Sequence, residues 1–280
     1  WINLGFITFQ PMEFVKVAFV LAGTATLDKL LTTRNLTAFI GFSGACIGAL
    51  ILMRDLGTSV IFFVTFLVVA FMRSGDIRTI AFISAGAALG AFAVVSFLPY
   101  IASRFEAWGH VWEYADTIGY QQTRTLQYSA SGGLLGLGGG NGYLVGIPAS
   151  DTDLVFGILC EEWGLIVALC AVLILIFLAL LTLFFMRSCK SSFYAISACG
   201  AVSIYLIQTA LNVFGSLDML PLTGVTLPFL SNGGSSMVVC WALLSFIKAA
   251  DDRYRPEWQD SGDEEALSEL ETVESVGESI

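Results

Sequence analysis

Residues 164–186 read GLIVALCAVLILIFLALLTLFFM. Because this stretch contains no charged side chain, it indicates the fold class. A helix of these residues is about 34 Å long, and the hydrocarbon core of a bilayer is about 30 Å thick. Lipid offers no hydrogen-bond partner to an unpaired backbone group, so a spanning segment of this kind is helical. The stretch therefore predicts a membrane-spanning helix.

Apolar stretches of similar character flank residues 164–186 on both sides. Hydrophobic residues make up 56% of the chain and charged residues 13%, about half the charged share of an ordinary soluble domain. The mean hydropathy is +0.79. The apolar blocks predict an all-α, polytopic membrane protein with seven transmembrane segments, at approximately 12–28, 36–53, 56–72, 79–99, 155–186, 192–214 and 225–249.

The net charge of −10 belongs to the end of the chain. Residues 251–280 hold eleven acidic and two basic side chains, whereas the rest is close to neutral. This stretch is also poor in large apolar residues, so we expect a transmembrane domain at 1–250 and a disordered acidic tail at 251–280. No stretch is basic enough to indicate nucleic-acid binding.

The basic residues predict the orientation, because cytoplasmic loops carry an excess of lysine and arginine. Three basic residues fall on one side of the seven segments: Arg54, Arg104 and Arg124. Nine fall on the other: Lys29, Arg34, Arg73, Arg78, Arg187, Lys190, Lys248, Arg253 and Arg255. The nine-residue side and the tail are therefore expected in the cytoplasm. The loop at about 100–154 becomes the one large extracytoplasmic element, and loops of that length are usually functional or disordered.

Cysteine and histidine usage argues against a metal centre built from these residue types. The six cysteines are scattered, mostly in apolar stretches, and form no CxxC pair, so we expect small buried side chains. His110 is the single histidine of the chain, which excludes a histidine-rich site.

Four places put polar groups where a membrane makes them costly, and the first two are short. In FQPMEFVK, residues 9–16, Glu13 and Lys16 are three residues apart and share one helix face. They form either an interfacial ion pair or a pair that lines a cavity. In MRDLGTS, residues 53–59, Asp55 either caps the following helix or faces a cavity.

The third place is IPASDTDLVFGILCEEWG, residues 147–164, where the large loop re-enters the membrane. Asp153 is either a helix N-cap or a general base, since a carboxylate beside apolar walls has a raised proton affinity. An active site or a cation site is indicated by the gathering of four acids, Asp151, Asp153, Glu161 and Glu162.

The fourth place is LPLTGVTLPFLSNGGSSM, residues 220–237, in which prolines and glycines interrupt the helix pattern. The stretch is either a broken helix that lines a cavity or a kinked helix with small residues for close packing. Gln208, Asn212 and Asp218 precede it and are expected to face the same cavity.

These motifs resemble those of the SEDS family (shape, elongation, division and sporulation), which includes RodA, FtsW and SpoVE. WINLG and FQPMEFVK are similar to the family's W-I-x-L-G and Q-P-S-E-x-x-K, and RDLGTS is similar to P-D-L-G-T. GYQ at 119–121, followed by SGGLLGLGGGNG at 131–142, follows the family's loop pattern. SDTDLVFGILCEEWG resembles H-T-D-F-I-F…E-E-x-G, and residues 220–237 resemble L-P-x-T-G-x-x-L-P-F-x-S-Y-G-G-S-S.

The resemblance covers residues 1 to about 250 and implies ten transmembrane helices, of which this chain holds the last seven. The chain begins at Trp1 and is expected to be a piece of a longer protein. It departs from the family pattern at four places: Arg54 replaces a proline, Asp151 stands where histidine is frequent, Asn232 stands where tyrosine is frequent, and FGSLDMLP varies a family run. These departures leave open whether the chain serves division, elongation or sporulation.

The resemblance implies a peptidoglycan glycosyltransferase that polymerises lipid II and polyprenyl-linked glycan into β-1,4-linked strands. Asp153 is the expected catalytic base, and Arg104, Arg124 and Lys16 are the candidates for the leaving diphosphate. A divalent cation, Mg²⁺ or Mn²⁺, is expected to share that role, with no organic cofactor. The remaining substrate-binding candidates are Glu13, Asp55, Gln121, Glu161, Glu162, Gln208, Asn212, Ser231 and Ser235.

The expected partner is a class B penicillin-binding protein, a transpeptidase. The expected location is the bacterial cytoplasmic membrane, with the loop extracytoplasmic and the tail cytoplasmic. Two other functions remain open: a lipid II flippase or other transporter, which broken helices and buried polar residues also fit, and a non-catalytic divisome scaffold.

Overall fold

The computed structural model describes residues 2–3, 8–28, 33–75, 77–78, 81, 83–86, 88, 99–187 and 189–251. Two sequence expectations lie mostly outside these residues: the membrane segment at 79–99 and the acidic tail at 251–280. The described part is helical apart from one small hairpin, in which β1 (Ile2–Asn3) pairs antiparallel with β2 (Thr8–Phe9). The all-α expectation therefore holds with that one addition, which the sequence pattern did not indicate.

The first three helices correspond to three predicted segments and begin where local chemistry favours it. They are α1 (Pro11–Asp28), α2 (Thr33–Leu52) and α3 (Leu56–Ser74). Proline opens α1 at the position where a missing N–H costs nothing. Asp55 accepts the Thr58 N–H and so caps α3, which ends at Gly75 in the left-handed conformation, with φ of 62°.

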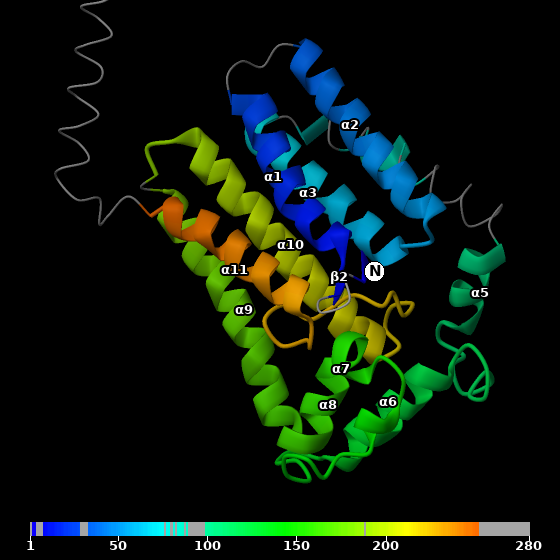
Figure 1. Cartoon of the computed structure of the whole chain (residues 1–280). Helices are drawn as coiled ribbons and strands as arrows, with labels where there is room; N and C mark the ends of the chain where they lie inside the picture. The colour runs from blue at the N-terminus through cyan, green and yellow to red at the C-terminus, as the bar shows by residue number, and fades with distance from the viewer. Residues whose placement is uncertain are drawn as a thin grey trace, which may run out of the picture.

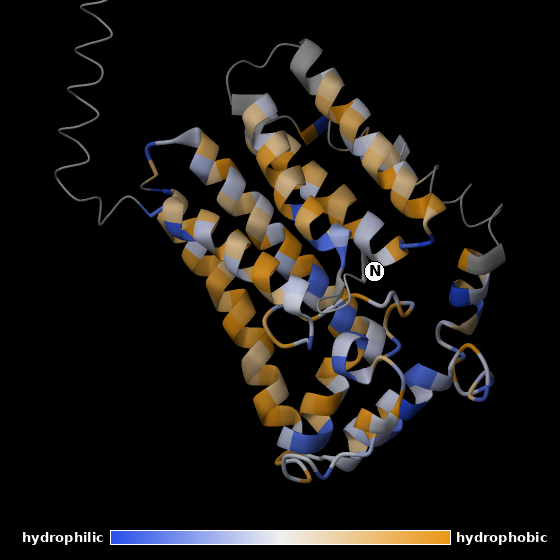
Figure 2. Cartoon of the chain, viewed as in Figure 1, coloured by the Kyte–Doolittle hydropathy of each residue, from blue (hydrophilic) through white to orange (hydrophobic). Residues whose placement is uncertain are grey.

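Helix α10 (Ser192–Ser216) is the centre of the bundle, and α9 (Gly164–Met186) lies along one edge (Figure 1). α10 packs against α1, α3, α9 and α11, and small residues at 197–203 allow close approach. α9 instead exposes apolar side chains along most of its length, and its ribbon is coloured hydrophobic in Figure 2. In the described part of the chain, two helical stretches are long and apolar enough to cross a bilayer, Val155–Met186 and Ser192–Ser216.

The predicted segment at 225–249 is shorter than expected. Only α11 (Gly234–Ala249) is helical, and residues 220–233 run as extended chain and turns. Pro221 and Pro228 cannot donate helix hydrogen bonds, and the backbone turns left-handed at Gly224 and Phe229, with φ of 69° and 63°. The broken-helix interpretation is therefore correct for this stretch, and the span given for it was too long.

The loop at 100–154 has its own structure at the end of the bundle where α9 begins (Figure 1). It contains α5 (Pro99–Ala107), α6 (Tyr120–Ser131), a 3₁₀ turn η1 (Leu144–Gly146) and α7 (Ser150–Asp153). α8 (Val155–Ile158) and a π-helical turn η2 (Leu159–Trp163) then lead into α9. The predicted segment at 155–186 is thus interrupted before Gly164, where φ is 84°.

Candidate active site

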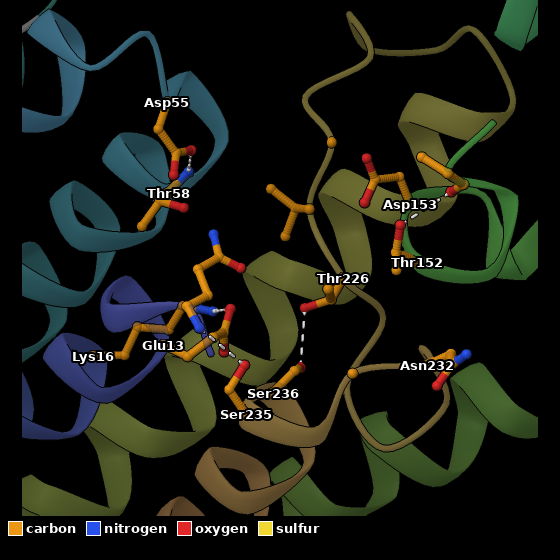
Figure 3. Close-up of a pocket in the computed structure, with 15 residues that line it drawn as sticks. Glu13, Lys16, Asp55, Thr58, Thr152, Asp153, Thr226, Asn232, Ser235 and Ser236 are labelled. Carbon is orange, nitrogen blue, oxygen red and sulfur yellow. Dashed lines mark hydrogen bonds and ion pairs between the residues drawn. The ribbon is translucent and has the colours of Figure 1, made fainter. Parts of the chain in front are cut away.

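The four polar stretches singled out in the sequence meet around one cavity of about 230 Å³ (Figure 3). α1 contributes one wall, the start of α3 a second, the α7 turn a third, and the broken segment before α11 a fourth. The lining residues are Gln10, Glu13, Lys16, Asp55, Thr58, Ala149, Thr152, Asp153, Gly224, Val225, Thr226, Asn232, Gly233, Ser235 and Ser236. Segments more than 200 residues apart in sequence therefore build a single polar pocket among apolar helices.

Asp153 is the last residue of α7 and points its half-buried carboxylate into this pocket (Figure 3). Burial raises the pKa of Asp153, and the negative charges of Asp151 and Asp55 add to the rise. Hydrogen bonding to Thr152 and the positive charge of Arg104 act in the opposite direction. Asp153 makes no side-chain cap to α8, so the N-cap interpretation is not supported, whereas the base interpretation has the expected environment.

Two predicted residues hold the backbone around Asp153 in place. The side-chain amide of Asn212 on α10 donates to the carbonyls of Asp153 and Val225, each at 2.8 Å. Ser231 Oγ donates to the Thr152 carbonyl at 2.6 Å and accepts the Leu227 N–H at 2.7 Å. These contacts tie the α7 turn to the broken segment 220–233, so both residues support the pocket wall rather than line it.

Glu13 and Lys16 form a buried ion pair that opens onto the pocket. Lys16 Nζ lies 2.8 Å from Glu13 Oε1, and the lysine is only 2% exposed. A lysine that reaches for headgroups would be exposed at its tip, so the structure favours the cavity-lining alternative. Ser235 lies beside the pair, where its hydroxyl accepts the Gln10 N–H at 3.4 Å.

Asp55 satisfies both interpretations offered for it. One carboxylate oxygen caps α3 through the Thr58 N–H at 3.0 Å, and the residue also lines the pocket. Gln208 does not line the cavity itself. Its amide donates to Thr226 Oγ1 at 3.3 Å, and Thr226 lines the cavity.

The predicted arginines and Gln121 lie outside the lining. Arg104 Nη1 donates to the Leu222 carbonyl at 2.6 Å, close enough to lower the pKa of Asp153. Arg124 contacts Gln127 at 3.1 Å and stands over the Tyr120 ring, and the Gln121 amide donates to Pro148. Arg104 is therefore the arginine that the fold brings towards the pocket.

Glu161 and Glu162 also lie outside the lining, because they hold the glycine-rich loop. Glu161 is fully buried and accepts the N–H groups of Tyr143 and Leu144 at 2.7 and 2.9 Å. Glu162 accepts the Gly140 N–H at 3.1 Å. These hydrogen bonds tie the glycine-rich loop to η2, so the visible role of both glutamates is structural.

Two of the departures from the family pattern contact each other. The Asn232 side-chain amide donates to Asp151 Oδ2 at 3.0 Å, and the Asn232 N–H donates to the Asp151 carbonyl at 2.8 Å. The sequence reasoning noted each departure alone. Only the fold shows that they form one interaction at the rim of the pocket.

Sequence reasoning did not single out Gln10, Thr58, Thr226 or Ser236, which also line the pocket. Each is a neutral polar residue within one of the polar stretches at 9–16, 53–59 and 220–237, so the signal was the motif rather than a charge. Ala149 likewise carried no chemical signal, yet its φ of 59° sets the turn that presents α7.

A helical bundle with exposed apolar side chains and an acid-bearing polar pocket between its helix ends is the architecture of an integral membrane protein with a polar binding site. The family profile of the FtsW/RodA/SpoVE cell cycle proteins matches residues 1–255. The chain is 30% identical to the probable peptidoglycan glycosyltransferase FtsW of Wigglesworthia glossinidia brevipalpis, over 91% of this chain and 70% of that protein. It is also 30% identical to the peptidoglycan glycosyltransferase RodA of Mycobacterium leprae, over 88% of this chain and 57% of that protein.

Solved structures agree with this assignment. A peptidoglycan synthase complex, described as coordinating polymerization and crosslinking, contains a chain that matches with a TM-score of 0.73 and 26% identity, over 91% of this chain and 74% of that one. The crystal structure of Thermus thermophilus RodA matches in fold, with a TM-score of 0.59 and 24% identity, over 91% and 70%. The chain therefore belongs to the FtsW/RodA/SpoVE family, the SEDS family of membrane peptidoglycan glycosyltransferases.

Proposed function

We propose that this chain polymerises lipid II into β-1,4-linked glycan at the outer face of the cytoplasmic membrane, with Asp153 as the general base. The observation that carries the proposal is the position of Asp153 in the pocket where all four polar stretches meet. Its raised pKa adds support, because a base whose pKa lies nearer to neutral pH accepts a proton more readily.

The chemistry needs one proton acceptor and a stabilised leaving group. The 4-hydroxyl oxygen of the incoming lipid II sugar attacks the anomeric carbon of the lipid-linked strand and passes its proton to Asp153. The bond from that carbon to the phosphate oxygen breaks, and undecaprenyl diphosphate leaves with the electron pair. Attack on the face opposite the leaving group inverts the anomeric carbon, which gives the β linkage.

Positive charge for the diphosphate comes from two of the predicted residues. Arg104 lies near Asp153, and Lys16 faces the pocket but is already paired with Glu13. Arg124 is engaged on α6, away from the lining. Arg104 is therefore the first candidate for diphosphate contact, and Lys16 contributes to the potential of the pocket.

A divalent cation, Mg²⁺ or Mn²⁺, fits the pocket through Asp55. Among the described residues no three His, Cys, Asp or Glu side chains gather as a complete metal site. Mg²⁺ commonly takes only one or two carboxylates together with water and substrate phosphate. Glu13 is occupied by Lys16, which leaves Asp55 as the carboxylate that would hold the ion beside the base. The ion would neutralise charge on the leaving diphosphate.

The proposed membrane placement follows the positive-inside pattern, with seven segments in this chain of ten in the whole fold. α9 and α10 are the long apolar helices, and three shorter apolar helices accompany them: Thr37–Leu52, Leu56–Met72 and Gly234–Ala249. Arg187 and Lys190 at the far end of α9 would lie in the cytoplasm. The pocket then lies towards the outer face, with the acidic tail on the inner face.

A class B penicillin-binding protein is the proposed partner. The support is the similarity to a chain of the solved peptidoglycan synthase complex, in which polymerization and crosslinking are coordinated. Affinity purification of the full-length protein from native membranes should recover a transpeptidase of this class. Recovery of other membrane complexes without it would overturn this part of the proposal.

The activity itself is tested by giving purified lipid II to the full-length protein in liposomes, with and without the transpeptidase. Glycan strands and free undecaprenyl diphosphate should form together, and chelation by EDTA should stop the reaction until Mg²⁺ is restored. Movement of lipid II across the bilayer without strands would indicate a flippase, and neither result would indicate a scaffold. Full activity in EDTA would show that the reaction does not need a divalent cation.

A further inference from the structure

The glycine loop, residues 132–143, exposes large apolar side chains at the start of α9. Leu135 is 82% exposed and Tyr143 is 71% exposed, and Trp163, which is 55% exposed at the end of η2, has Gly139 of the loop close to its ring. No charged residue occurs between Arg124 and Asp151. Apolar exposure of this kind on an uncharged segment marks an interaction surface rather than an ordinary water-exposed loop.

Backbone hydrogen bonds fuse the glycine loop to the first turn of α9. Leu165 N donates to the Gly133 carbonyl at 3.0 Å, and Ile166 N donates to the Leu134 carbonyl at 3.4 Å. Leu137 N donates in turn to the Glu161 carbonyl at 2.9 Å. The first N–H groups of a helix usually turn to water or to a cap, but here the loop satisfies them internally. Internal satisfaction is what a helix end requires where water is scarce.

The length of α9 places this junction at the membrane boundary. Leu165 and Arg187 are 22 residues apart, which is about 33 Å of helix, against about 30 Å of hydrocarbon. With Arg187 at the cytoplasmic boundary, Leu165 and the loop bonded to it lie at the outer boundary. Tyr143 and Trp163 are the residue types enriched at that level.

We propose that the glycine loop inserts its exposed leucines into the outer leaflet and acts as an interfacial membrane anchor for the large extracytoplasmic loop. The lipid surface is the chosen occupant because the loop carries the exposed leucines Leu134, Leu135 and Leu137 and is bonded through its backbone to the start of α9, whose exposed side chains are apolar, and neither the loop nor α9 contains a charged residue. Buried Glu161 joins this anchor to the helix that follows Asp153, since it accepts the Tyr143 and Leu144 N–H groups. The proposal rests on the proposed membrane placement of α9.

The test measures the depth of single nitroxide labels in the full-length protein in liposomes. Each label is attached through p-acetylphenylalanine, so the native cysteines stay unchanged, and is placed at Leu135, at Asp116 or at Leu173. Asp116 is an exposed polar position on the same large loop, and Leu173 is an exposed apolar position within α9. Collision with dissolved oxygen reports lipid, and collision with a water-soluble nickel chelate reports water.

The oxygen-to-nickel collision ratio at Leu135 should exceed the ratio at Asp116 several-fold and approach the ratio at Leu173. A ratio at Leu135 equal to that at Asp116, with Leu173 still in lipid, would overturn the anchor and leave the membrane placement standing. A water-like ratio at Leu173 would overturn the membrane placement itself. Exclusion of both reagents from Leu135 would show burial against protein and would also overturn the anchor.

Discussion

Glu13 and Lys16 form a buried pair whose charges depend on each other. Glu13→Gln leaves the lysine charge without its partner, so we expect a loss of about 2–3 kcal/mol of stability. The double variant Glu13→Gln with Lys16→Met removes both charges and should recover most of that loss. Thermal unfolding in detergent measures the wild type, Glu13→Gln, Lys16→Met and the double variant. Additive losses in the double variant would contradict a coupled pair.

The pH dependence of polymerisation should follow the ionisation of Asp153. Its pKa is raised by burial above the usual value of about 3.9, and the base acts only when deprotonated. The acidic limb of kcat/KM should therefore lie above the range of an ordinary carboxylate. Asp151→Asn removes a negative neighbour and should move the limb to lower pH, whereas Arg104→Gln removes a positive one and should move it to higher pH. Shifts of the same sign in both variants would rule out this assignment.

The sequence predicted the charged residues that line the pocket. It did not show which nearby charged residues lie outside the lining, because that depends on the backbone geometry. Glu13, Lys16, Asp55 and Asp153 all line the cavity, as expected for ionisable groups in a membrane protein. Glu161 is also a carboxylate and lies close to Asp153 in the sequence. Its side chain nevertheless binds the backbone of the glycine loop and does not line the pocket. The π-helical turn η2 decides this difference, and no propensity rule predicted that turn.

The glycine loop depends on individual glycines for close backbone approach. Gly136 has a φ of 82°, and a Cβ there would collide with the Glu162 carbonyl. Gly133 has a φ of 57° and open space around it, so Gly133→Ala carries only the conformational cost. We expect Gly136→Ala to lower the melting temperature clearly more than Gly133→Ala. Equal effects would mean that the loop does not pack against η2 as described.

Periodicity and length predicted the helices α1, α2, α3, α9 and α10 well, because each carries a long apolar stretch. The errors fall where backbone breaks lie inside apolar sequence. Residues 225–233 read as membrane segment by composition, but Pro228 and the left-handed Phe229 keep them out of α11. The helices within 100–154 were not predicted, since tertiary contacts rather than apolar periodicity stabilise them.

The whole molecule should span the membrane with the large loop outside and the tail inside. Single cysteines at Asp116, an exposed position of the large loop, and at Ser261, in a cysteine-free background, report the two sides. A membrane-impermeant thiol reagent should label the first in intact cells and the second only after lysis. The reverse pattern would invert the topology and remove the pocket from the face where lipid-linked glycan is proposed to grow.

The folded molecule should tolerate loss of the Asp153 charge. A raised pKa means that the protonated carboxyl stabilises the fold below the usual pKa and that this contribution is lost as the pH rises through the raised value. At neutral pH the ionised group therefore costs stability. Asp153→Asn removes that cost, so the variant should melt at or slightly above the wild-type temperature, which makes any loss of activity chemical in origin.

The most direct measurement is the rate of lipid II polymerisation by full-length Asp153→Asn protein in liposomes, beside wild type and Asp151→Asn. We expect a fall of about 10²- to 10⁴-fold for Asp153→Asn, the usual consequence of losing a general base. Asp151→Asn should stay close to wild type at neutral pH, because Asp151 lies outside the pocket lining. Glycan strands made at the wild-type rate by Asp153→Asn would show that Asp153 is not the general base.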